Sequence, residues 1–175
     1  EDIEPFLEMN VDEPYESGLG KVSSKFYNII HSIIYSDGIV FVYISKIPEA
    51  MTFCMALEVA GYNQYQQSNM FKDSRQKFPR RNHEGKILDS SDPKDSAANY
   101  ILLTGKTSKS LMNEQLRKMN EPHNQNGSEI KIVVASEVAK EGLNFLRIRE
   151  IHIYLSLHHS KRTGRLKDSG ARTGG

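Results

Sequence analysis

Two short apolar runs constrain the fold of this chain more than any other feature. Residues 39–44 read Ile-Val-Phe-Val-Tyr-Ile, and residues 130–135 read Ile-Lys-Ile-Val-Val-Ala. Runs of this length, rich in β-branched and aromatic residues, are typical of strands that are buried on both faces. Such strands occur mainly in parallel sheets that helices cover on both sides. The two runs therefore predict an α/β domain.

Helical patterns lie between the predicted strands. Residues 23–35 carry apolar side chains at helical spacing, with Ser23 or Ser24 as the cap and Asp37-Gly38 at the end. A second helix is predicted from Pro48 to Gly61, and a third over residues 108–119. Residues 100–103 and 150–154 read as further strands. Strands that alternate with helices predict a parallel sheet flanked by helices on both faces.

The remaining segments are polar. Residues 1–22 are acidic and are expected to form an extended lead-in to a domain over residues 23–154. Residues 63–98 are rich in amide, charged and serine side chains, so we expect a surface insertion that is partly disordered. Residues 155–175 hold five Lys or Arg residues against a single Asp, a net charge of +4. This tail is expected to be disordered, with a weak affinity for nucleic acid.

Composition excludes several classes of protein. The net charge of +1 gives no overall field that demands nucleic acid or a membrane, and no apolar run approaches the ~20 residues that span a bilayer. The single cysteine, Cys54, favours a reducing compartment. The chain begins with Glu, which suggests an excerpt of a longer protein. Scattered histidines give no metal-ligand spacing, so no metal site is expected.

Two segments stand where an α/β sheet binds ligands. Thr104-Gly105 and the stretch from Ser136 to Asn144 directly follow predicted strands. Ligands of parallel sheets bind at the carboxyl ends of the strands, so we expect both segments to lie there. Thr104-Gly105-Lys106-Thr107 lacks the upstream glycine of a phosphate loop of the Gly-x-x-x-x-Gly-Lys kind, so a phosphate loop is the minor alternative for this segment. No complete catalytic site is visible in the sequence.

The order of these segments resembles a known family. The stretch Ala135-Ser136-Glu137-Val138-Ala139-Lys140-Glu141-Gly142-Leu143-Asn144-Phe145 resembles motif V of superfamily 2 helicases. Residues 39–62 resemble the motif IV region, and residues 100–105 resemble the strand-plus-Thr-Gly motif. The residue pattern of these motifs is most similar to the helicases of large DNA viruses, a group that includes poxvirus-like early transcription factors and nucleoside triphosphatases. The resemblance implies a RecA-like, P-loop NTPase-like C-terminal helicase lobe.

The resemblance also implies roles for individual residues. Thr104, the Gly105 amide and Ser136 would contact phosphates of a DNA or RNA strand without reading its sequence. Gly142 and Asn144 would contact ATP. Glu141 would support the boundary with an N-terminal helicase lobe of the same protein. That first lobe would hold most of the ATP and Mg²⁺ site, so neither is expected to bind tightly to this chain alone.

Each of these residues also has a purely structural interpretation. Thr104-Gly105 can be a turn that ends a strand. Gly142 can be the C-cap of a helix, and Ser136 can be an ordinary N-cap. The sequence alone leaves both interpretations open for each position.

The family pattern fails after the last predicted strand. Motif VI of the family has the form Gln-x-x-Gly-Arg-x-x-Arg, whose arginines reach the γ-phosphate. The matching window, residues 165–172, keeps only Arg172, with Arg165 in place of Gln. A shifted frame restores a Gly164-Arg165 pair but needs a deletion. Three explanations remain for the incomplete motif VI: an altered reading of the gene, an unrelated C-terminal sequence, or a degenerate helicase. Arg165 and Arg172 are the candidate catalytic remnants.

The leading hypothesis is the C-terminal lobe of an ATP-dependent helicase or translocase in viral transcription. The full-length protein would hydrolyse NTP, whereas the isolated chain would be inactive. The family places such proteins in the viral factory of the host cytoplasm and in the virion, with the viral RNA polymerase as a partner and no membrane attachment. The alternative is a catalytically degenerate lobe that docks onto nucleic acid or polymerase. A third hypothesis is an unrelated α/β domain with a coincidental motif V.

Overall fold

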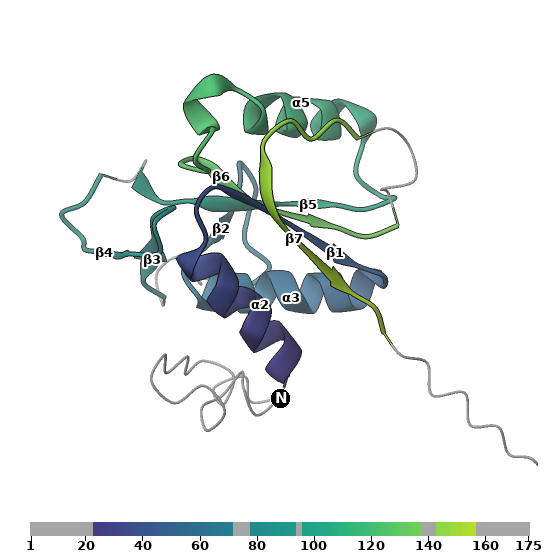
Figure 1. Ribbon diagram of the computed structural model, residues 1–175, viewed down its shortest axis with the longest axis horizontal. Coiled ribbons are helices and arrows are strands. Elements are labelled where there is room, and N and C mark those ends of the chain that lie inside the picture. The colour runs from purple at the N-terminus through teal and green to yellow at the C-terminus, as the bar shows by residue number, and fades with distance from the viewer. Residues whose placement is uncertain (1–22, 72–77, 94–95, 138–142, 157–175) are drawn as a thin grey trace, which may run out of the picture.

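A five-stranded parallel sheet forms the centre of the molecule, in the order β2-β5-β6-β1-β7. The computed structural model describes residues 23–71, 78–93, 96–137 and 143–156 (Figure 1). The strands of the sheet are β1 (Ile39–Ile44), β2 (Asn63–Gln64), β5 (Asn99–Leu103), β6 (Ile130–Ala135) and β7 (Ile148–Tyr154). The helices are α2 (Ser24–Tyr35), α3 (Ile47–Val59) and α5 (Lys109–Met119), with a 3₁₀ turn η3 (Pro122–Asn124).

Helices cover both faces of this sheet. Helices α2 and α3 lie on one face, and α5 lies on the other (Figure 1). Each strand of the sheet runs parallel to its neighbours, and β1 lies between β6 and β7. The predicted α/β fold with a parallel sheet between two helical layers is therefore confirmed.

The predicted helix starts follow from local chemistry. The Ser23 hydroxyl accepts a hydrogen bond from the Phe26 amide, and the Ser108 hydroxyl accepts one from the Leu111 amide. Each bond satisfies an amide that has no partner inside its helix. Pro48 stands in the first turn of α3, where a missing N–H costs nothing. These caps explain why the helix boundaries could be predicted closely.

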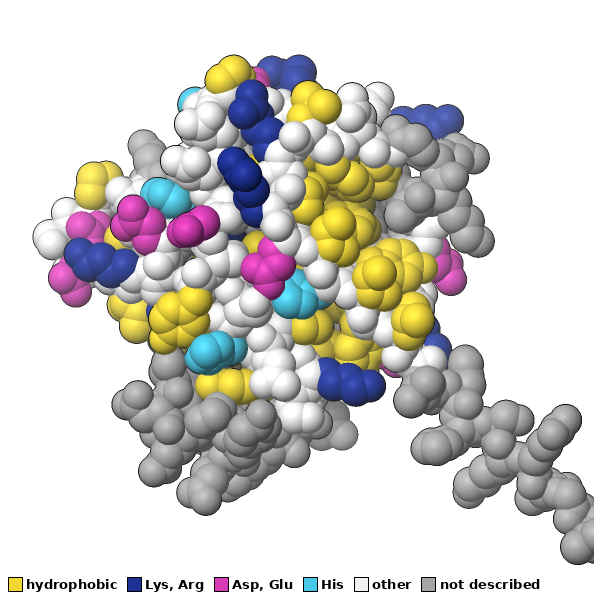
Figure 2. All heavy atoms as spheres, in the orientation of Figure 1, with side chains coloured by type: hydrophobic (Ala, Val, Ile, Leu, Met, Phe, Trp, Pro, Cys, Tyr) yellow, Lys and Arg dark blue, Asp and Glu magenta, His cyan; other side chains and the backbone are white. Residues whose placement is uncertain are grey.

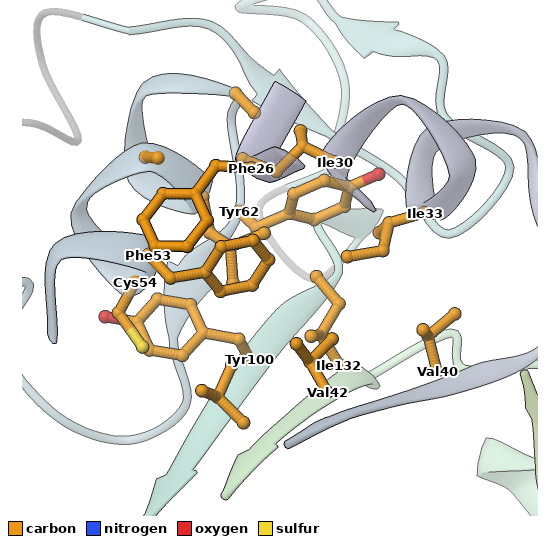
Figure 3. Packing of buried hydrophobic residues seen from close by; sticks show 14 of the residues in the cluster. Phe26, Ile30, Ile33, Val40, Val42, Phe53, Cys54, Tyr62, Tyr100 and Ile132 are labelled. Carbon is orange, nitrogen blue, oxygen red and sulfur yellow. The ribbon is translucent and has the colours of Figure 1, made fainter. Parts of the chain in front are cut away.

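Side chains on alternate strand positions build two separate cores. Val40 and Val42 of β1 pack with α2 and α3, whereas Ile39 of the same strand packs on the opposite face with α5. Figure 3 shows the larger core, in which the rings of Phe26, Phe53 and other aromatic residues lie between the helices and the sheet. The Phe26 and Phe53 rings meet edge to face, with centroids 5.1 Å apart. Burial on both faces explains the continuous apolar sequence of β1 and β6.

Residues 63–98 contain more regular structure than their composition predicts. Strand β2 extends the main sheet beside β5, and β3 (Arg80–Arg81) forms an antiparallel hairpin with β4 (Ile87–Leu88). Arg81 ties the hairpin to the core, since its Nε donates to the Ala60 carbonyl at 2.7 Å. Polar contacts of this kind leave no apolar periodicity in the sequence. Within this segment, residues 72–77 and 94–95 lie outside the described part, as do the lead-in 1–22 and the tail from residue 157 onward.

The amino end of β6 holds a buried charge. The Lys131 residue has no exposed surface, and its ammonium donates to the Ser36 carbonyl at 2.7 Å and to the His83 carbonyl. Burial lowers the pKa of Lys131, although the charges of Asp37 and Glu150 oppose the shift. Lys131 therefore joins the α2–β1 turn to the hairpin at the amino edge of the sheet.

A second polar cluster at the amino edge makes stability depend on pH. The Tyr65 hydroxyl donates to Glu129 Oε1 at 2.6 Å, and His123 Nε2 lies 2.7 Å from Glu129 Oε2. Burial alone would raise the pKa of Glu129, but these hydrogen bonds and the nearby charges of His123 and Lys118 hold it below 4.5. A lowered carboxyl pKa stabilises the fold above the ordinary pKa, and this contribution is lost as the pH falls through the lowered value.

We therefore expect Glu129→Gln to remove part of the acid sensitivity of the fold. The free energy of unfolding of the unmodified chain should fall more steeply below pH 4.5 than that of the variant. Denaturant titrations at a series of pH values measure both curves. Parallel curves throughout the acidic range would show that Glu129 has the same pKa in the folded and unfolded chains.

Candidate nucleic-acid interface

The carboxyl ends of β5 and β6 bring two of the predicted contact residues together. Leu103 is paired with Ala135 across the two strands, so Thr104 and Ser136 are the next residues on each. The Ser136 amide donates to the Leu103 carbonyl at 3.0 Å, which extends the ladder by one bond. Sequence positions 32 residues apart thus share one edge of the sheet, where parallel sheets bind ligands.

Thr104 is engaged in the turn that ends β5. Its amide donates to Thr107 Oγ1 at 3.0 Å, and its hydroxyl accepts from the Lys106 amide at 3.2 Å. The Thr107 amide donates back to the Thr104 carbonyl at 2.9 Å. The residue itself is buried. Thr104 therefore belongs to a turn that ends strand β5. Its hydroxyl proton remains available to donate a hydrogen bond to a ligand.

Gly105 presents the open backbone group of this turn. The residue is exposed, and its amide meets no acceptor within the described part of the chain. A Cβ added to Gly105 would meet nothing within 4 Å, and its φ lies outside the left-handed region. The fold therefore does not require glycine here, in contrast to Gly61, whose Cβ would lie 2.5 Å from the Pro79 carbonyl oxygen. Close approach of a ligand would explain why a glycine stands at this position.

The variant Gly105→Ala tests whether glycine is needed at this position for the fold or for close approach of a ligand. We expect the free energy of unfolding to change by no more than about 0.5 kcal/mol, because the new methyl meets open space. Affinity for single-stranded nucleic acid should fall, because the methyl keeps a phosphate away from the amide. Thermal unfolding and fluorescence anisotropy measure the two effects. An affinity equal to that of the unmodified chain would remove Gly105 from the interface.

Two lysines, Lys106 and Lys109, follow the Gly105 amide in the chain. The sequence motifs did not indicate Lys109. Lys106 and Lys109 are exposed and form no ion pair within the described residues. Lys109 opens helix α5, whose first turn contains no acidic residue. A cation at a helix N-terminus is unfavourable because the helix dipole is positive there. A lysine that lowers stability at this position is explained if the helix start binds an anion. The lack of acidic residues in the first turn of α5 is the sequence feature that could have indicated such a site.

Ser136 lies deeper than a phosphate contact requires. The residue has no exposed surface, and its Oγ has no hydrogen-bond partner among the residues that the structure describes. A buried hydroxyl without a partner costs roughly 1–3 kcal/mol. A strand phosphate could reach this hydroxyl only after a neighbouring group moves. The residue that follows, Glu137, has a φ of 53°, which is uncommon for a residue with a side chain.

Asn144 does not lie beside Ser136 at the carboxyl edge, where the sequence predicted it. Its carbonyl accepts a hydrogen bond from the Asn120 side chain at 3.0 Å, and Asn120 also accepts from the Leu146 amide at 3.2 Å. Asn120 caps the end of α5, which lies at the amino edge of the sheet. The physical reason is the parallel connection, since the chain must return to the amino edge before β7 starts at Ile148.

The other predicted site residues lie outside the described part of the chain. These are Glu141 and Gly142 of the motif V resemblance, and Arg165 and Arg172 of the motif VI window. The described residues contain no group of three or more His, Cys, Asp or Glu side chains that could hold a metal ion. They also contain no helix with the length and apolar character that crossing a membrane requires.

Comparison with known proteins agrees with the helicase resemblance at a coarse level. No family model matches the chain. A protein of Acanthamoeba polyphaga mimivirus, named as a candidate ATP-dependent RNA helicase, is 28% identical over 166 residues. The alignment covers 82% of this chain but only 14% of the mimivirus protein. The chain is therefore similar to a short part of one viral protein that bears a helicase name.

Proposed function

We propose that this chain is the C-terminal RecA-like lobe of a superfamily 2 helicase or translocase that acts in viral transcription. The lobe holds the backbone of a DNA or RNA strand at the carboxyl edge of its sheet. ATP and Mg²⁺ bind between this lobe and an N-terminal lobe of the same protein. The site of action is the cytoplasmic viral factory and the virion, beside the viral RNA polymerase.

The turn after β5 carries this proposal. It combines the Gly105 amide, which has no acceptor among the described residues, with the exposed side chains of Lys106 and Lys109. An open amide, two cations and a helix N-terminus together suit a phosphate group. The contacts are sequence-independent, as a protein that moves along a strand requires.

ATP hydrolysis between the two lobes would supply the energy for movement. Closure of the lobes around ATP and reopening after hydrolysis would step them along the strand. We expect the isolated chain to hydrolyse no ATP, and a turnover by the pure chain would contradict the proposed sharing of the site.

Replacement of the two hydroxyl residues tests the strand contact. We expect the double variant Thr104→Ala/Ser136→Ala to bind single-stranded DNA and RNA several-fold more weakly than the unmodified chain, as loss of hydrogen bonds to a charged phosphate predicts. Thr52→Ala is the matched control, because Thr52 is exposed on α3 and its hydroxyl donates to the Pro48 carbonyl of the same helix. Equal affinities of the double variant and the control would count against the assignment of Thr104 and Ser136.

A docking lobe without catalysis is the second candidate function. The observation that favours it is the window at residues 165–172, where neither alignment frame gives an intact motif VI. Such a lobe would still bind nucleic acid or polymerase. ATP hydrolysis by the longer protein, stimulated by nucleic acid and lost in Arg172→Ala, would support the helicase and exclude the docking lobe.

A further inference from the structure

A polar depression lies at the amino edge of the sheet, away from the turn at Gly105 at the carboxyl edge. Its walls are the α2–β1 turn, the β3–β4 hairpin, the loop before β6 and the start of β7. Its volume is about 480 Å³, within the range of sites for small molecules. The polar side chains that line it are Asp37, His83, Glu84, Gln125, Asn126 and Arg149. Each of these residues lies at least six positions in the sequence from the nearest undescribed residue.

Close packing between the walls fixes the shape of this depression. Gly85 at the hairpin has a φ of 81°, and a Cβ added there would lie 2.2 Å from the Ile34 carbonyl oxygen. Gly38 has a φ of 92°, and a Cβ on it would lie 2.6 Å from Arg149 Cγ. The buried Lys131 ammonium joins the α2–β1 turn to the hairpin through two backbone carbonyls. The depression is therefore a fixed part of the fold, and the packing against Gly38 positions the stem of Arg149.

The polar side chains that line the depression are not engaged with one another. Within the described part of the chain, none of the six forms a hydrogen bond or an ion pair through its side chain. The charged side chains elsewhere in the loop before β6 behave differently, since His123 is paired with both Glu121 and Glu129. The hydrogen-bonding groups of the depression are therefore all available to a ligand.

Opposite charges line the depression without meeting. Figure 2 shows acidic, basic and histidine side chains close together on the face of the molecule between the hairpin and β7. Arg149 and Glu84 both line the depression, but no ion pair joins them. The second carboxylate, Asp37, interacts with the charge of the buried Lys131, which offsets it. With histidine neutral, the lining thus offers one uncompensated guanidinium and one uncompensated carboxylate.

We propose that this depression binds a small zwitterion of the α-amino acid kind. The ligand carboxylate pairs with the Arg149 guanidinium, and the ligand ammonium pairs with the Glu84 carboxylate. The side-chain amides of Gln125 and Asn126 offer further donors and acceptors. A phosphate strand fits poorly here, because the two carboxylates of the lining repel it. The site is therefore separate from the interface at Gly105, and it does not depend on the proposed helicase function.

Amide chemical-shift titrations with glycine test this proposal, because glycine carries both charges and almost nothing else. At low salt, glycine should shift the amides of Gly38, Glu84, Asn126 and Arg149 and should saturate at roughly millimolar concentrations, as a ligand of few atoms does. Acetate and methylammonium each carry one of the two charges, so each should bind several-fold more weakly than glycine. Shifts that do not saturate, or equal responses to glycine and to either single ion, would overturn the proposal.

Neutral variants of the two charged residues locate the site. Arg149→Gln and Glu84→Gln should each weaken glycine binding by about three- to fivefold, as the loss of one exposed ion pair predicts, and the double variant should show no saturable shift. Both residues are exposed, so the variants should keep the fold, which circular dichroism checks. Lys86→Gln and Glu114→Gln are the matched controls, because they remove the same charges from exposed positions outside the depression. Unchanged affinity in the double variant, or an equal loss in the controls, would contradict the assigned site.

Discussion

Glu58→Ala is expected to lower the free energy of unfolding by about 3–5 kcal/mol, because the substitution leaves several hydrogen-bond donors without their acceptor. Glu58 is a buried residue of α3. Its Oε1 accepts from the Met70 amide at 2.7 Å and from the Tyr100 hydroxyl at 2.7 Å, and its Oε2 accepts from the Phe71 amide at 2.9 Å. The variant removes the acceptor from three donors, of which the Tyr100 hydroxyl is fully buried and the Met70 and Phe71 amides are part-buried.

The Glu58 carboxylate joins parts of the fold that are far apart in sequence. It ties α3 to β5 and to the segment after β2, so its loss should loosen residues 65–71 as well as lower stability. Glu84→Ala is the matched control, because Glu84 is exposed on the hairpin, and it should change stability by less than about 0.5 kcal/mol. Denaturant unfolding measures both variants. A loss of under about 1 kcal/mol in Glu58→Ala would mean that water replaces the carboxylate.

The second large effect concerns nucleic-acid affinity. We expect Lys106→Glu/Lys109→Glu to weaken the binding of single-stranded nucleic acid by roughly tenfold or more, because two attractive charges become repulsive at the phosphate site. The slope of log affinity against log salt should fall by about 0.7 for each phosphate contact that is lost. Titrations at several salt concentrations give the affinity and the slope together.

A matched pair of single variants controls for total charge. Lys106→Glu and Lys86→Glu alter the net charge by the same amount, but Lys86 lies on the hairpin between β3 and β4. We expect Lys106→Glu to weaken binding and to reduce the salt slope, and Lys86→Glu to do neither. If both variants weaken binding equally, the lysines act through the overall field of the molecule and not through a local phosphate site.

The sheet and its helices could be predicted because their signals are local. β1 and β6 are apolar over their whole length, since both faces of each strand are buried. Ser23, Pro48 and Ser108 mark helix starts by hydrogen bonds or backbone geometry that act within a few residues. Strand β2 could not be predicted, because two polar residues, Asn63 and Gln64, join the sheet only through pairing with β5. That pairing depends on tertiary structure.

The candidate site was predicted in part. Thr104, Gly105 and Ser136 do meet at one edge, because strands that are neighbours in a parallel sheet end at the same side. Their accessibility could not be predicted, since the burial of Ser136 depends on how other elements pack around it. Asn144 was expected beside Ser136, but the return of the chain to the start of β7 carries it to the other edge.

Amide chemical-shift mapping tests the central claim most directly, namely that this chain holds a nucleic-acid strand at the carboxyl edge of its sheet. An isotope-labelled chain is titrated with a single-stranded oligonucleotide. The largest shifts are predicted at the amides of Gly105, Lys106 and Thr107, with a smaller change at Ser136. Shifts that concentrate at the amino edge around Asn120 to Asn126, or no shifts at saturating oligonucleotide, would contradict it.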